Sequence, residues 1–131
     1  MTWINLIFVF ITSFSPTDRD ELAGIYSIRR KSHYNGTDWS TTTLEINCDA
    51  TASFSRRTHG GLITWEGTWT NNKDTLTVKI KPIITEDGKE YFGQWDKANR
   101  FLIRKNRLTP IDLNRAMKPE SYKRTGDKDC S

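Results

Sequence analysis

The segment Gly67-Thr68-Trp69 is followed by a polar turn at residues 71–74 and then by Thr75-Leu76-Thr77-Val78. On both sides of the turn, glycine or an apolar residue stands at every second position, with threonine between them. A period of two places alternate side chains on opposite faces of a β-strand. The pattern therefore predicts a pair of antiparallel strands with one buried face.

Similar short segments recur about every ten residues along the chain, which is typical of a barrel or a sandwich. The predicted strands cover residues 24–29, 41–47, 51–57, 63–69, 76–81, 91–95, 100–104 and 122–125. We predict short helical turns at residues 17–22 and 111–117. Because closure removes exposed sheet edges, we predict an all-β fold. It is an antiparallel up-and-down barrel of about eight strands, closed by the return of the last strand to the first.

Size and composition indicate one globular domain. The chain has 131 residues, of which 35% are hydrophobic and 27% are charged, which excludes a disordered or fibrous protein. The net charge is +4, and the basic residues are scattered in small groups such as 29–31, 56–57 and 100–107. Scattered charge is typical of solvated faces, so we do not expect nucleic-acid binding.

Residues 1–15 form an apolar N-terminal run. The run is too short to span a bilayer but suits the core of a signal peptide. We therefore expect a secreted or periplasmic protein without a membrane span, in which residues 16–131 form the barrel domain. The alternative is that the run is a first strand or an apolar segment packed on the domain.

The chain has two cysteines, Cys48 and Cys130. In an exported protein they can form a disulfide that closes a loop of roughly 80 residues, worth about 4 to 5 kcal/mol by loop entropy. Against this, Cys130 is the penultimate residue, and chain ends usually fray. Cys48 also follows Leu44 and Ile46 at a period of two, which is compatible with a buried free thiol. Both alternatives stay open at this point.

Several short motifs carry a resemblance to a known family. They are Leu22-Ala23-Gly24-Ile25-Tyr26, Leu44-Glu45-Ile46, residues 49–54, Gly67-Thr68-Trp69, Leu76-Thr77-Val78 and Tyr122-Lys123-Arg124. Together they resemble the small bacterial lipocalin-like (calycin-type) barrel domains of exported Bacteroidota proteins. The resemblance implies an eight-stranded barrel whose interior can hold a small apolar ligand. Tyr26 stands where those domains usually have tryptophan. The Cys-x-x-Cys of the related copper-resistance barrels is absent, so no copper role is implied.

Four aromatic residues are the leading candidates for a binding site: Trp65, Trp69, Tyr91 and Trp95. Their spacing by two or four residues within each segment predicts that they share a face with Ile63. Inward residues of a closed barrel either fill the core or line a cavity. Filling is the default at this size, and the cavity is the alternative.

A cavity would also need polar groups that orient its ligand. Tyr26, Arg56 and Arg104 follow core-type residues on their predicted strands, and each can anchor a carboxylate. For the two arginines, an exposed charge at a strand end is the simpler interpretation. We predict no metal site and no cofactor, because His33, His59 and Cys48 lie in separate predicted loops.

Catalytic sequence patterns are absent: the chain has no Gly-x-Ser-x-Gly, His-Glu-x-x-His or phosphate loop. We therefore expect an exported, non-enzymatic protein that holds a small hydrophobic or anionic ligand in the barrel. The alternative is a protein-interaction module, such as an inhibitor or immunity-type protein, with a filled core. A five-stranded nucleic-acid-binding barrel is a third hypothesis, which predicts Trp39, Phe92 and residues 100–107 on one outer surface.

Overall fold

The computed structural model describes residues 19–31, 39–111 and 120–130. The predicted signal peptide at residues 1–15 lies outside this part of the chain, as does most of the helical turn predicted at 111–117. Within the described part, no helix combines the length and the apolar character that crossing a membrane requires.

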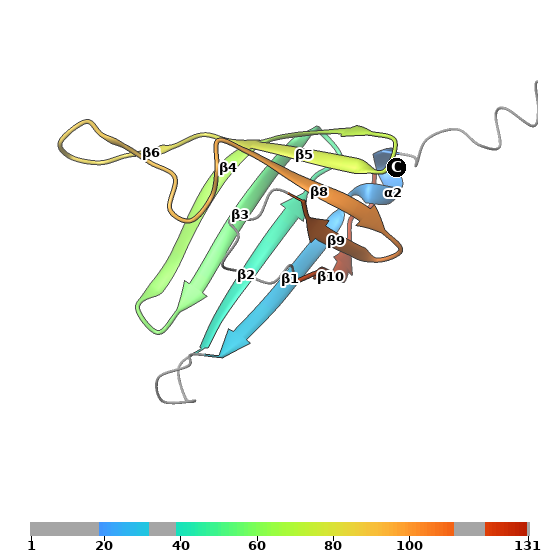
Figure 1. Cartoon of the computed structure of the whole chain (residues 1–131), viewed down its shortest axis with the longest axis horizontal. Coiled ribbons are helices and arrows are strands. Elements are labelled where there is room, and N and C mark those ends of the chain that lie inside the picture. The colour runs from blue at the N-terminus through green and yellow to red at the C-terminus, as the bar shows by residue number, and fades with distance from the viewer. Residues whose placement is uncertain (1–18, 32–38, 112–119, 131) are drawn as a thin grey trace, which may run out of the picture.

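Eight strands form one closed antiparallel barrel (Figure 1). Each barrel strand pairs with the next one along the chain, and the last pairs with the first, so the predicted up-and-down barrel is confirmed. The strands are β1 (Gly24–Lys31), β2 (Trp39–Ile46), β3 (Thr51–Thr58), β4 (Gly61–Asn72), β5 (Thr75–Ile80), β8 (Ala98–Arg104), β9 (Arg107–Pro110) and β10 (Tyr122–Asp127). The short predicted helix before β1 is α2 (Arg19–Leu22).

A two-stranded hairpin is inserted between β5 and β8 and extends away from the barrel wall (Figure 1). It consists of β6 (Ile83–Ile84) and β7 (Glu90–Tyr91). Its turn contains the Asp87-Gly88 pair, which the sequence marks as a hairpin signal. Gly88 has a φ of +80°, in the left-handed region that glycine adopts without strain.

The barrel has two ends, which we call the base and the mouth. The base carries α2 and the turns at residues 47–50, 73–74 and 105–106. The mouth carries the turn at residues 59–60 and the inserted hairpin. This division matters for function because a ligand can enter a barrel only at an end.

Every second side chain along the barrel strands points inward, and these side chains fill the interior. The largest fully buried ones are Trp69, Phe54, Leu44, Ile46, Leu76, Leu108 and Val78. Gly67 is needed among them because a Cβ at this position would collide with the carbonyl oxygen of Lys79 on β5. The glycine therefore lets β4 and β5 approach closely between larger residues.

One prediction at the mouth was wrong. The strand predicted at residues 91–95 ends at Tyr91, and residues 92–95 form a turn in which the Trp95 amide donates to the carbonyl of Phe92 (3.1 Å). Gly93, with a φ of +67°, explains the change, because the left-handed conformation breaks an extended strand. Ile63 stands at the same parity along β4 as the buried Trp65, as predicted, and it is 45% exposed because β4 reaches the mouth there.

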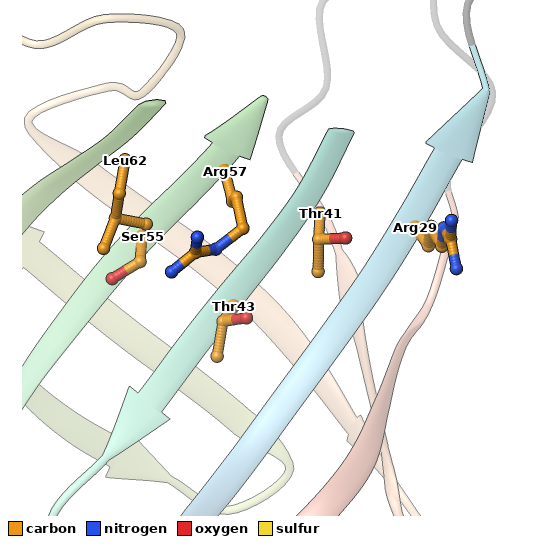
Figure 2. Close-up of a pocket in the computed structure, with 6 residues that line it drawn as sticks. All are labelled: Arg29, Thr41, Thr43, Ser55, Arg57 and Leu62. Atoms are coloured by element: carbon orange, nitrogen blue, oxygen red, sulfur yellow. The ribbon is translucent and has the colours of Figure 1, made fainter. Parts of the chain in front are cut away.

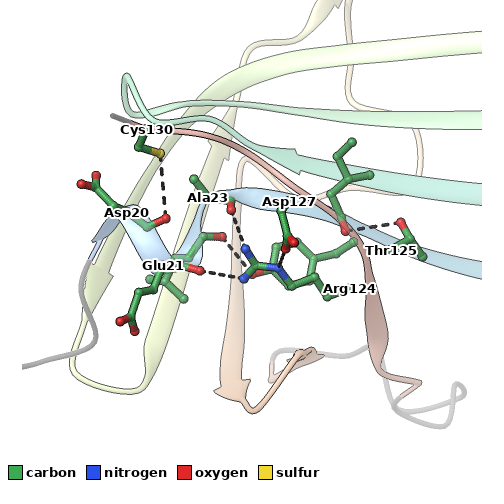
Figure 3. Close-up of polar contacts among 10 residues, drawn as sticks. Asp20, Glu21, Ala23, Arg124, Thr125, Asp127 and Cys130 are labelled. Atoms are coloured by element: carbon green, nitrogen blue, oxygen red, sulfur yellow. Dashed lines mark hydrogen bonds and ion pairs between the residues drawn. The ribbon is translucent and has the colours of Figure 1, made fainter.

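The base is held together by Arg124 of β10 (Figure 3). Its guanidinium donates to the main-chain carbonyls of Glu21 (2.6 Å) and Ala23 (2.8 Å) and to the Tyr26 hydroxyl (3.2 Å), and it pairs with Asp127 (2.8 Å). It also lies over the ring of Tyr26, 5.6 Å from the centroid. These contacts connect the last strand to α2 and the first strand, at the point where the barrel closes.

Cys48 and Cys130 form a disulfide at the base, which is the first of the two alternatives for these residues. Their Cα atoms are 5.5 Å apart, and 82 residues separate them in sequence. The bond attaches the C-terminal segment to the turn between β2 and β3. The Cys130 sulfur also lies 3.8 Å from the Asp20 carbonyl oxygen of α2 (Figure 3).

Candidate functional site

The mouth contains three of the four aromatic residues predicted to form a site. Trp65 on β4 is 2% exposed, and its indole N–H donates to the carbonyl of Tyr91 on β7 (3.3 Å). The two rings are tilted, with centroids 5.9 Å apart. Tyr91 itself is 45% exposed. Trp65 is therefore a core residue that connects the inserted hairpin to the barrel wall.

Trp95 enters the mouth from the turn at residues 92–95. Its ring stacks on Phe54 of β3, with centroids 4.1 Å apart and planes inclined by 17°. Phe54 in turn contacts Phe101, and Phe101 contacts Tyr122 edge-on. Trp95 thus forms the outermost layer of an aromatic core, and this layer belongs to a turn instead of a strand.

The indole N–H of Trp95 is buried and has no hydrogen-bond partner among the described residues. Leaving such a donor unpaired costs about 1–3 kcal/mol. Next to it, Gln94 accepts a hydrogen bond from the Arg56 guanidinium (3.1 Å). In the described part of the chain, this exposed bond is the only hydrogen bond from residues 92–95 to the barrel wall. Apart from this bond, the turn is held by packing of Phe92 and Trp95 against the core.

The remaining predicted site residues lie elsewhere. Trp69 is 1% exposed at the base, where its indole N–H donates to the carbonyl of Asn47 (2.8 Å). The Tyr26 hydroxyl donates to the carbonyl of Leu22 (2.8 Å), and burial raises the pKa of Tyr26. Arg104 ends β8 beside the turn at residues 105–106, at the opposite end from Arg56. Only Trp65, Tyr91, Trp95 and Arg56 of the predicted set are brought together.

A separate groove of about 420 Å³ lies on the outer face of β1–β4 (Figure 2). It is lined by Arg29, Thr41, Thr43, Ser55, Arg57 and Leu62. All six occupy outward positions, which alternate with core residues such as Leu44 and Phe54. The groove could not be predicted from the sequence, because each of its strands alone looks like an ordinary strand with a solvated face. Only the register between strands reveals the common surface.

The register places these residues in two adjacent cross-strand rows. Arg29, Thr41, Arg57 and Leu62 form one row across β1–β4. Ser27, Thr43, Ser55 and Thr64 form the next row. Within this second row, the hydroxyls of Ser27 and Thr43 lie 3.3 Å apart, and those of Ser55 and Thr64 lie 3.1 Å apart.

In the described residues, no three His, Cys, Asp or Glu side chains come together to hold a metal ion. The five-stranded architecture of the third hypothesis was wrong because the barrel has eight strands, and so was the outer position of Phe92, which is partly buried against the core. Comparisons with models of protein families, with curated protein sequences and with solved structures find no match.

Proposed function

We propose that the protein is an exported, non-enzymatic binding protein that holds a small aromatic carboxylate at the mouth of its barrel. The observation that carries this proposal is the pair Gln94 and Trp95. Gln94 offers an amide oxygen to Arg56, while Trp95 stacks a flat ring on Phe54. A carboxylate attached to an aromatic ring offers both groups in one molecule. Such a ligand can take the place of the turn at residues 92–95.

Two local contributions favour exchange of the turn for a ligand. A carboxylate carries a full charge and can accept two parallel hydrogen bonds from arginine, so it binds the Arg56 guanidinium more strongly than the neutral amide oxygen of Gln94 does. Stacking on Phe54 is retained, because aromatic pairs are worth about 0.5–1.5 kcal/mol whichever ring supplies them. Displacement also returns the unpaired indole N–H of Trp95 to water. Below this layer the core is filled, so the proposed site is shallow and suits a small ligand.

Two further observations support the proposal. The segments that resemble lipocalin-like barrels, around Tyr26 and Arg124, contact each other at the base. The disulfide between Cys48 and Cys130 is compatible with export, since disulfides persist in oxidising compartments. The alternative function, a protein-interaction module with a filled core, is supported by the buried Trp65 and Trp69 and by the outer groove.

The experiment measures binding of 1-naphthoate and its neutral analogue 1-naphthalenemethanol by isothermal titration calorimetry. We expect Arg56→Gln to weaken naphthoate binding about tenfold or more, the effect of losing one charge-assisted hydrogen bond, and to change binding of the alcohol little. Arg104→Gln, the matched change at the base, should leave both affinities unchanged. Equal effects of the two variants, or no binding of naphthoate to the wild-type protein, would contradict the proposal.

The Trp95→Ala variant tests whether the ligand displaces the turn at residues 92–95 or only contacts it. If Trp95 occupies the ligand's place, its removal strengthens naphthoate binding. If Trp95 is instead part of the wall that contacts the ligand, its removal weakens binding. Thermal unfolding of the variant confirms that the barrel is intact before the titration is interpreted.

A further inference from the structure

The groove on the outer face of β1–β4 is not used by the proposed site at the mouth. We propose that it binds an extended acidic segment of a partner protein. The groove faces solvent on the other side of the barrel wall from Phe54 and Trp95. This second site is therefore independent of any ligand at the mouth.

The positive charge of the groove determines which kind of partner it can bind. Arg57 has no ion pair or hydrogen bond with another residue in the described part of the chain, and Arg29 stands in the same cross-strand row. Figure 2 shows the Arg57 side chain turned back along β3 toward Ser55 and Thr43. Among the described residues of this face, the nearest acidic side chains in the register are Glu45 and Glu66, which lie beyond the hydroxyl row, and Glu45 pairs with Lys128 (3.4 Å). The groove itself therefore attracts anionic groups.

The spacing of the two arginines favours a chain of acidic groups over a single small anion. Arg29 and Arg57 lie on strands that flank β2, and neighbouring strands are about 4.8 Å apart, so the two positions are separated by about 10 Å. One carboxylate cannot be held by both in a bidentate manner. Two acidic side chains of one extended segment can each contact one arginine.

Hydroxyls and one apolar residue complete the surface. Thr41, Thr43 and Ser55 lie between the arginines or beside them and can hydrogen-bond carboxylates or peptide groups. Leu62, which is 53% exposed, offers an apolar contact at the end of the arginine row. β2 and β3, in the middle of the groove, pair with a strand on each side, so a partner cannot add a strand to them. Recognition must occur through side chains on the face.

Fluorescence anisotropy of a labelled (Glu-Thr)4 peptide tests the proposal with the full chain. The matched peptide (Gln-Thr)4 has no side-chain charge. We expect the acidic peptide alone to bind, and its affinity to fall as salt screens the exposed charges. Arg57→Gln should weaken binding about fivefold or more, because it removes a charge-assisted contact. Lys79→Gln, which removes the same charge from the outer face of β5, should change binding by less than about twofold.

Two results would overturn the proposal. The first is an equal loss in Arg57→Gln and Lys79→Gln, which would mean that the peptide responds only to net charge. The second is displacement of the peptide by inorganic sulfate at equal concentration, which would identify a site for small anions only. Failure of naphthoate to bind at the mouth would leave these measurements unaffected, so the two proposals can fail separately.

Discussion

Arg56 and Arg57 are consecutive residues of β3 whose side chains serve opposite sides of the barrel wall. Arg56 donates a hydrogen bond to Gln94 at the mouth (3.1 Å), whereas Arg57 lines the outer groove. The alternation of a β-strand requires this separation. These adjacent arginines therefore belong to two different proposed binding sites. The ligand of Arg56 is a small aromatic carboxylate, and that of Arg57 is an acidic segment of a protein.

The first prediction concerns this pair of arginines. Arg56→Gln should lower the affinity for naphthoate about tenfold and leave the acidic peptide bound as before. Arg57→Gln should do the reverse. Both variants are titrated with both probes at one salt concentration. Similar losses for both probes in both variants would show that the arginines act through net charge and that the two sites are not separate.

Gly67→Ala should destabilise the barrel strongly. The added Cβ meets the backbone of Lys79 and Ile80, which cannot move without separating β5 from β4. Overpacking costs about 1–3 kcal/mol and occasionally more, and contact with rigid backbone places this variant at the upper end. Gly60→Ala is the control, since its Cβ would meet only the Thr58 hydroxyl at 3.6 Å. Urea unfolding compares the two, and equal stability of both variants would contradict the close approach of β4 and β5.

Removal of the disulfide should lower the free energy of unfolding. The Cys48–Cys130 bond spans 82 residues of sequence. The loop-entropy relation gives about 4 to 5 kcal/mol for a loop of this length. A Cys48→Ser/Cys130→Ser double variant, compared with the oxidised protein in urea, measures the loss. The same unfolding midpoint for both proteins would show that the bond does not constrain the unfolded chain.

Stability should fall at alkaline pH because of Tyr122. Burial raises the pKa of this phenol above its ordinary value of 10.0. Above about pH 10 the unfolded chain releases the proton while the folded protein retains it, so the free energy of unfolding declines by at most about 1.4 kcal/mol per pH unit. Below pH 10 the Tyr122 phenol does not make the free energy of unfolding depend on pH. Tyr122→Phe should flatten the decline between pH 10 and 12. An unchanged slope in this variant would contradict the assignment.

The barrel could be predicted from sequence because its signals are local. Alternation around Leu76 and Val78 marks a strand, and short turns between similar segments indicate near-neighbour pairing. The end of the strand at Tyr91 was missed because Tyr91 and Trp95 also fit a period of two or four. The glycine at position 93 was the available signal, since a left-handed residue ends an extended segment.

The two proposed sites could be predicted only in part. Trp65, Tyr91 and Trp95 were identified because aromatic residues at a regular spacing stand out, and Arg56 because it follows a core-type residue on its strand. The outer groove was not identified, because threonine, serine and arginine on outward positions look like any solvated strand. Its existence depends on Thr41 lying opposite both Arg29 and Arg57. That register is a property of paired strands and cannot be derived from one strand alone.

The central claim is that Trp95 occupies the place of an aromatic carboxylate at the mouth. Fluorine-19 NMR of protein labelled with 5-fluorotryptophan tests it most directly, with Trp95→Phe assigning the resonance. On addition of 1-naphthoate, we predict that the Trp95 resonance moves to a solvent-exposed position while that of Trp69, at the base, stays unchanged. A Trp95 resonance that does not move at saturating naphthoate would contradict the claim.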